Sequence, residues 1–159
     1  MKVFLTLLLF VSSFLVSAQQ SALPSIVLKD MDGKAFNISD LAKEEKPVVL
    51  SFWATWCGPC QYELPHLKEL EKKMHGKKIV FVSISCDKDK AAWEKMVKEQ
   101  GLGGVQLHNG GDREFMTAFG IRGIPRFILL DKEGKIVNPN MTRPSNPETE
   151  KTLKALKGI

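Results

Sequence analysis

Apolar residues follow two different spacings along the middle of the chain. Residues 47–53 and 78–85 are compact runs rich in Val, Ile and Phe, which is typical of strands buried in a sheet. Between them, leucines recur at helical intervals from Leu64 to Leu70, behind Pro59, a residue type favoured at the first position of a helix. The pattern predicts a strand, a helix and a second strand parallel to the first.

Turn and capping residues divide the rest of the chain into short elements. Residues 26–29 with 35–38, and 126–131 with 135–138, are expected to form two hairpins. The other expected elements are a helical turn over 41–45 and helices over 88–100 with Asp87 as N-cap, 113–119 opened by Asp112, and 148–157. Residues 105–108 are too few to assign. Strands that alternate with helices predict one α/β domain, a sandwich around a mixed sheet.

The first 18 residues differ from the rest of the chain. Lys2 precedes an apolar stretch that ends with Val16 and Ala18, the pattern of a signal peptide cleaved before Gln19. The stretch is short for a membrane span, which needs about 20 residues, but an uncleaved N-terminal anchor facing the periplasm remains the alternative. We expect a periplasmic or secreted mature chain of residues 19–159, the size of a single domain.

The charges argue against a nucleic-acid partner. The chain has 23 Lys and Arg and 18 Asp and Glu, a net charge of +5. They are interleaved along the expected helix surfaces rather than gathered with aromatic residues into one stripe. We therefore expect a solvated surface and no contact with nucleic acid.

Cys57 and Cys60 stand where the first buried strand ends and the next helix begins. Backbone N–H groups at the start of a helix have no partner within the helix and lie at the positive end of its dipole, so they stabilise a thiolate. Cys57 is expected to be the nucleophile. Cys60, one turn further in, is expected to resolve the mixed disulfide that forms at Cys57.

A static disulfide or half of a zinc site would also account for the two cysteines. Zinc needs a second pair of ligands, and beyond this motif the chain has only Cys86, His66, His75 and His108, without paired spacing. We therefore expect a redox pair and no metal.

Residues 52–60, Phe-Trp-Ala-Thr-Trp-Cys-Gly-Pro-Cys, resemble the active site of the thioredoxin superfamily. Residues 60–65, Cys-Gln-Tyr-Glu-Leu-Pro, and the N-terminal hairpin are similar to its extracytoplasmic TlpA/ResA-type branch. This resemblance implies a thioredoxin-like three-layer sandwich, with a central mixed sheet between helices. It also implies dithiol/disulfide exchange that needs no cofactor beyond the Cys57–Cys60 disulfide.

The resemblance also implies how a substrate is held. Pro125 matches the family's cis-proline that faces the two cysteines, and Ile124 before it would pair with an extended substrate chain. Trp56, Gly58 and Pro59 would shape the groove beside Cys57.

Proton transfer from Cys60 is expected to differ from thioredoxin itself. Ser51 stands where thioredoxin has a buried Asp that assists the resolving thiol. Glu63, one turn beyond Cys60, matches the Glu of the TlpA/ResA pattern and is expected to accept the proton, through a water.

Two residues can each be interpreted in two ways. Cys86 ends the second buried strand at the sheet edge that also carries Cys57, so it is either a third redox thiol or, as we favour, an inert buried one. Arg126, after Pro125, either favours acidic substrate segments or is an ordinary exposed cation.

The sequence thus predicts a monomeric extracytoplasmic thiol:disulfide oxidoreductase that reduces protein disulfides. The Gly58-Pro59 dipeptide is that of reducing thioredoxin. By resemblance, its substrates would include apocytochrome c, and a membrane thiol reductase would supply electrons. A dithiol oxidant, a thiol peroxidase and a non-enzymatic thioredoxin-like binding module are the alternatives. The peroxidase is disfavoured by Ala54, which occupies the place of a required Thr or Ser.

Overall fold

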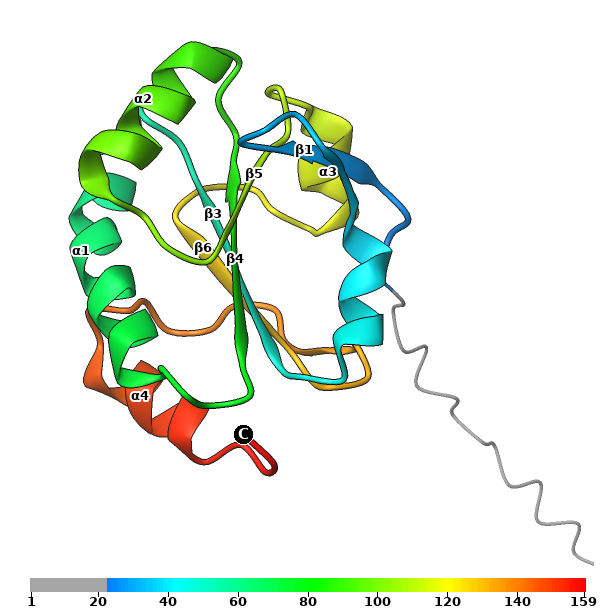
Figure 1. The fold of residues 1–159 in the computed structure, drawn as a ribbon, viewed down its shortest axis with the longest axis vertical. Coiled ribbons are helices and arrows are strands. Elements are labelled where there is room, and N and C mark those ends of the chain that lie inside the picture. The colour runs from blue at the N-terminus through cyan, green and yellow to red at the C-terminus, as the bar shows by residue number, and fades with distance from the viewer. Residues whose placement is uncertain (1–22) are drawn as a thin grey trace, which may run out of the picture.

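A computed structural model describes residues 23–159 of the chain. The predicted signal peptide, residues 1–18, lies outside this range. Seven strands form one sheet, and helices cover both of its faces, so that the fold has three layers (Figure 1). This confirms the thioredoxin-like sandwich expected from the sequence.

Strands and helices alternate along much of the described chain. The strands are β1 (Val27–Asp30), β2 (Ala35–Asn37), β3 (Val48–Trp53), β4 (Val80–Ser85), β5 (Val105–His108), β6 (Arg126–Leu130) and β7 (Ile136–Asn138). The helices are the 3-10 helix η1 (Ile38–Glu44), α1 (Gly58–Lys73), α2 (Lys90–Gln100), α3 (Arg113–Ala118) and α4 (Pro147–Lys154).

The sheet is mixed, with the strand order β2-β1-β5-β4-β3-β6-β7. Strands β3, β4 and β5 are parallel, whereas β6 and β7 continue the sheet antiparallel beyond β3, and the β1–β2 hairpin joins it antiparallel at β5. Both predicted hairpins are confirmed. Because β3 lies between β4 and β6, the start of α1 emerges near the middle of the sheet.

All six residues of β3 are buried, and its side chains alternate between two cores. Leu50 and Phe52 pack on the face covered by η1 and α3, together with Phe115. Val49 and Trp53 point to the opposite face, which α1, α2 and α4 cover (Figure 1). Burial on both faces explains why the strand reads as a continuous apolar run rather than an alternating one.

Several expected boundaries differ from the structure because capping contacts decide them. Helix α2 begins at Lys90 with Asp89 as its N-cap, so the prediction of Asp87 as the cap was wrong. The helical turn expected over 41–45 is η1, which begins at Ile38 because Asn37 caps it. Residues 105–108 form a strand. Their sequence is too short to indicate it, and the strand is stabilised by pairing with β4 and β1.

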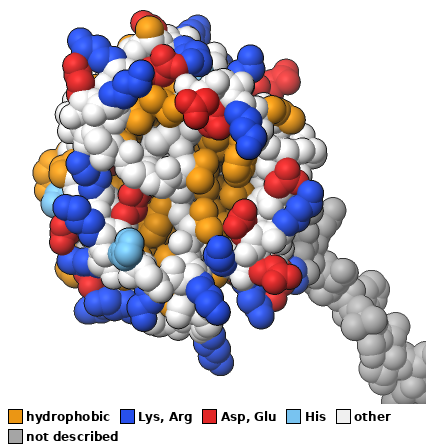
Figure 2. Space-filling model, viewed as in Figure 1, with side chains coloured by type: hydrophobic (Ala, Val, Ile, Leu, Met, Phe, Trp, Pro, Cys, Tyr) orange, Lys and Arg blue, Asp and Glu red, His pale blue; other side chains and the backbone are white. Residues whose placement is uncertain are grey.

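The surface in Figure 2 carries interspersed positive and negative side chains around an apolar centre. On this face no continuous basic stripe forms, as a nucleic-acid groove would require. None of the helices in the described range 23–159 has the length and apolar character needed to span a bilayer.

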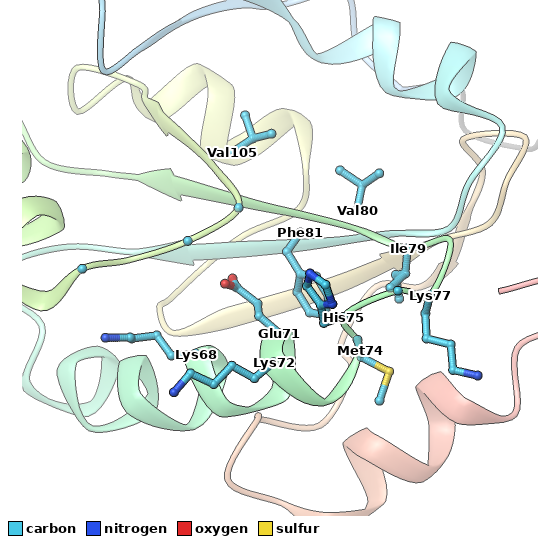
Figure 3. Close-up of a pocket in the computed structure, with 14 residues that line it drawn as sticks. Lys68, Glu71, Lys72, Met74, His75, Lys77, Ile79, Val80, Phe81 and Val105 are labelled. Carbon is cyan, nitrogen blue, oxygen red and sulfur yellow. The ribbon is translucent and has the colours of Figure 1, made fainter.

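A hollow of about 540 Å³ lies between the C-terminal end of α1 and the strands β4 and β5 (Figure 3). The Glu71 side chain points from α1 into it, toward the strands (Figure 3). Gly103 permits this approach, because a Cβ atom there would lie 2.6 Å from Glu71 Oε2. Burial raises the pKa of Glu71 from 4.5 to about 7, although the Lys68 ammonium partly opposes the shift.

Glu71 should make stability fall as the pH rises. The folded protein binds the Glu71 proton more tightly than the unfolded chain, so the free energy of unfolding decreases between about pH 4.5 and about pH 7. Glu71→Gln should therefore melt at a higher temperature than the wild type at pH 8, and the difference should shrink at pH 5. Thermal unfolding at both pH values checks this, with exposed Glu69→Gln as the control. An equal effect at both pH values would contradict it.

Candidate active site

Cys57 and Cys60 form a disulfide at the junction of β3 and α1, with an S–S distance of 2.00 Å and a Cα–Cα distance of 5.2 Å. Cys57 is the N-cap of α1, and Pro59 is the second residue of the helix, one later than the first position that the sequence predicted. The backbone N–H of Cys60 donates to Cys57 Sγ at 3.2 Å. Cys57 Sγ thus faces an otherwise unpaired donor at the positive end of a helix, an environment that favours negative charge.

The groups around the disulfide differ sharply in exposure. Cys57 is 6% exposed and Cys60 is 1% exposed, whereas Trp56 beside them is 70% exposed. Gly58 and Pro59 are also exposed. Tyr62, which the sequence analysis did not single out, adds a second large aromatic side chain with 64% exposure on the first turns of α1. Exposed aromatic groups next to a nearly buried disulfide are suited to contact another protein.

Ile124 and Pro125 lie at the start of β6, directly beside the active-site strand. Arg126 is paired with Phe52 of β3, and the Ile124–Pro125 peptide bond is cis, as the resemblance implied. The Ile124 side chain packs against the apolar cluster that contains Cys57 and Cys60. The fold therefore brings Trp56, the two cysteines and Ile124 together, although Ile124 is far from the others in the sequence.

Glu63 is 2% exposed, one helical turn after Cys60. Its two carboxylate oxygens accept hydrogen bonds from Ser145, one from the backbone N–H at 3.0 Å and one from the hydroxyl at 2.8 Å. Ser145 belongs to the segment between β7 and α4 and was not predicted as a site residue. A buried carboxylate held by two donors on one side is available to a neighbouring proton donor only through its remaining lone pairs.

Asp87 is a second buried carboxylate at this sheet edge. It accepts hydrogen bonds from the Thr55 backbone N–H at 3.0 Å, from the Thr55 hydroxyl at 2.7 Å and from the Ser85 hydroxyl at 2.7 Å. These bonds fix the loop that leads to Cys57. The position of Asp87 after a strand, at the edge that carries Cys57, was the one sequence signal for this role.

Ser51 lies in β3 and Cys86 directly follows β4, and neither is bonded to the Cys57–Cys60 disulfide. The Ser51 hydroxyl is 2.7 Å from the Ser83 hydroxyl on the neighbouring strand β4, so its polar group is satisfied within the sheet. Burial, and to a smaller extent the Asp87 carboxylate, raise the pKa of Cys86 to about 12. The Cys86 thiol is therefore protonated at neutral pH, and it lies 3.3 Å from Met116 Sδ.

Within residues 23–159, no three His, Cys, Asp or Glu side chains gather in a way that would hold a metal ion. The histidines are separated: His66 packs against Tyr62 with ring centroids 5.1 Å apart, His108 stacks on Trp93 at 5.0 Å, and His75 lines the hollow near Glu71.

Known proteins are similar to this chain in both sequence and fold. The model of the family described as Redoxin matches residues 18–156. The thiol-disulfide oxidoreductase ResA of Bacillus thuringiensis subsp. konkukian is 31% identical, over 84% of this chain and 75% of its own.

Two solved structures are similar to this chain in fold and in sequence. A candidate thiol-disulfide oxidoreductase from Bacteroides vulgatus has a TM-score of 0.73 and 55% identity, over 86% of this chain and 88% of that one. A thiol-disulfide oxidoreductase from Bacteroides fragilis has a TM-score of 0.73 and 28% identity, over 84% of this chain and 99% of that one. The chain belongs to the Redoxin family of the thioredoxin superfamily, and its similarity to ResA over most of its length makes it a TlpA/ResA-type thiol-disulfide oxidoreductase.

Proposed function

We propose that this oxidoreductase reduces disulfides in protein substrates outside the cytosol. The observation that carries the proposal is the N–H of Cys60 directed at Cys57 Sγ, beside an exposed Trp56. The reducing direction is supported by the Gly58-Pro59 dipeptide between the cysteines, since the thioredoxin that shares it has a potential of about −270 mV. Ile124 also supports this direction, because reducing members of the family tend to have an apolar rather than a polar residue before the cis-proline.

The reaction starts from the reduced pair. The Cys57 thiolate attacks one sulfur of the substrate disulfide, and the other substrate sulfur leaves as a thiolate and takes up a proton. Cys60 loses its proton and attacks Cys57 Sγ, which releases the second substrate sulfur. Two electrons pass to the substrate, and the protein ends with the Cys57–Cys60 disulfide present in the structure.

Glu63 is proposed to take the proton from Cys60. It is buried one turn away on α1, and Ser145 fixes its orientation through two hydrogen bonds. Those bonds leave further lone pairs on the carboxylate to accept a proton through a water. Ser51, which is bonded to Ser83, offers no carboxylate as a substitute.

Ile124 and Pro125 are proposed to align the substrate. An extended chain that pairs with the Ile124 backbone would lie beside Cys57, in the same way as an added strand. Trp56, Gly58 and Pro59 would form the other wall of this groove, since all three are exposed next to Cys57.

A reductant outside the cytosol needs a source of electrons. We propose that residues 1–18 direct export and that a membrane thiol reductase returns two electrons to the disulfide. Substrates of this class include apocytochrome c and wrongly oxidised envelope proteins. Monomeric exchange is sufficient, because both cysteines and Glu63 come from one chain.

Cys57→Ser should reduce a peptide disulfide no faster than dithiothreitol does alone, because the thiols that remain are Cys60, which is 1% exposed, and Cys86, whose raised pKa keeps it protonated. Cys60→Ser that has been reduced and then freed of dithiothreitol should instead accumulate a mixed disulfide between Cys57 and the peptide, since the resolving step is lost. Mass spectrometry of the quenched reaction measures both. Full activity of Cys57→Ser would contradict exchange and favour the binding module, and rapid turnover of peroxide by the wild type would favour the peroxidase.

Glu63→Gln should slow the resolving step by about a hundredfold, because a positioned base is lost. The measurement is the decay of a preformed mixed disulfide between Cys57 and a chromophoric thiol, followed by stopped flow. Glu69→Gln, an exposed change on the same helix, is the matched control. Decay of Glu63→Gln at the rate of this control, with both proteins folded, would remove Glu63 from the mechanism.

A further inference from the structure

A cavity of about 1000 Å³ lies next to the active-site loop and has no part in the exchange steps described above. Trp56 and Ile124, which flank the disulfide, both line it. Its apolar part is formed by Cys86, Met116 and Ile121. We call it the Trp56 cavity. The cavity therefore borders the place that a chain bound beside Cys57 would occupy.

The rim of the Trp56 cavity carries cations that have no acidic partner. Lys88, Arg113 and Arg122 line the cavity and are exposed, and none of them forms an ion pair within residues 23–159. The lining also holds two carboxylates: Asp87 is buried and accepts from Thr55 and Ser85, whereas Asp89 is exposed and caps α2 through the Ala92 N–H. Three exposed cations against one exposed carboxylate leave the opening with a net positive charge.

The positive charge continues on the other side of the cis-proline. A second hollow, of about 640 Å³, is lined by Pro125, Arg126 and Arg143. Arg126 donates to the Pro139 carbonyl at 3.2 Å, so it is held in place without its charge being neutralised. Cations thus lie on both sides of Ile124, the residue with which the substrate backbone is proposed to pair.

We propose that the Trp56 cavity selects the substrate, by binding an extended segment with an apolar side chain and carboxylates close to the reactive cysteine. The apolar side chain fills the space between Cys86, Met116 and Ile121. The carboxylates meet Lys88, Arg113 and Arg122. This rests on the proposed function, because the bound segment is taken to belong to a disulfide substrate of Cys57.

The test compares two peptides that differ only in charge. Each has one internal disulfide and a leucine beside a cysteine, and the flanking residues are either glutamate or lysine. The rate of reduction of each peptide is divided by the rate of the same protein on neutral hydroxyethyl disulfide. The acidic peptide should be preferred by about tenfold at low ionic strength, and the preference should fall toward unity in about 1 M salt, where screening is strong.

The double variant Arg113→Glu with Arg122→Glu should reverse this preference. Lys34→Glu with Lys157→Glu makes the same change of net charge at exposed residues outside the cavity, and it should keep the preference of the wild type. Equal rates on the two peptides, or an unchanged preference in the Arg113 and Arg122 variant, would overturn the assignment.

A binding measurement separates this proposal from the proposed function. Peptides in which serine replaces cysteine are titrated into the oxidised protein, with tryptophan fluorescence as the signal. Tighter binding of the acidic peptide, lost in the Arg113 and Arg122 variant, supports the cavity even if no disulfide is reduced. Reduction of hydroxyethyl disulfide together with equal binding of both peptides would overturn the cavity and leave the oxidoreductase intact.

Discussion

The hydrogen bond from the Cys60 N–H to Cys57 Sγ is the contact on which the active site depends. It exists because Cys57 caps α1, so the sulfur takes the place that a serine or aspartate oxygen has at other helix starts. The same geometry that begins the helix also favours negative charge on this sulfur. The contact that caps the helix is thus also the basis of the proposed reactivity of Cys57, and moving either end of the β3–α1 junction would change both.

The rest of the fold holds that junction in place. Strand β3 is buried along its whole length between two cores, which fixes the direction from which the chain reaches Cys57. Asp87 secures Thr55 in the loop itself, and Ser145 secures Glu63 beyond the first turn of α1. Both carboxylates are paired by hydrogen bonds to nearby donors, which offsets the cost of burying them. The exposed Trp56 and the basic cavity beside it lie around this hydrogen-bonded centre, where a partner can reach them.

Local sequence patterns were sufficient to predict much of the fold and of the active site. The buried run of β3, and Pro59 followed by the leucines of α1, predicted the junction and the redox pair, because each signal lies within a few residues of its effect. Asp87 was misassigned, since a capping residue and a loop anchor look alike until Thr55 is known to lie opposite. The contact between Glu63 and Ser145 joins residues 82 positions apart and has no local signal. The cis peptide at Pro125 was expected only through the family resemblance, and the Trp56 cavity arises from segments that meet only in the folded chain.

The reduction potential of the Cys57–Cys60 pair tests the central claim most directly. Residues 19–159 with Cys86→Ser would be equilibrated in graded dithiothreitol buffers, with tryptophan fluorescence as the readout. A protein that reduces its substrates should have a potential near or below the value of about −270 mV of thioredoxin. A potential close to the value of about −120 mV of the oxidant DsbA would contradict the account and reassign the protein to the formation of disulfides.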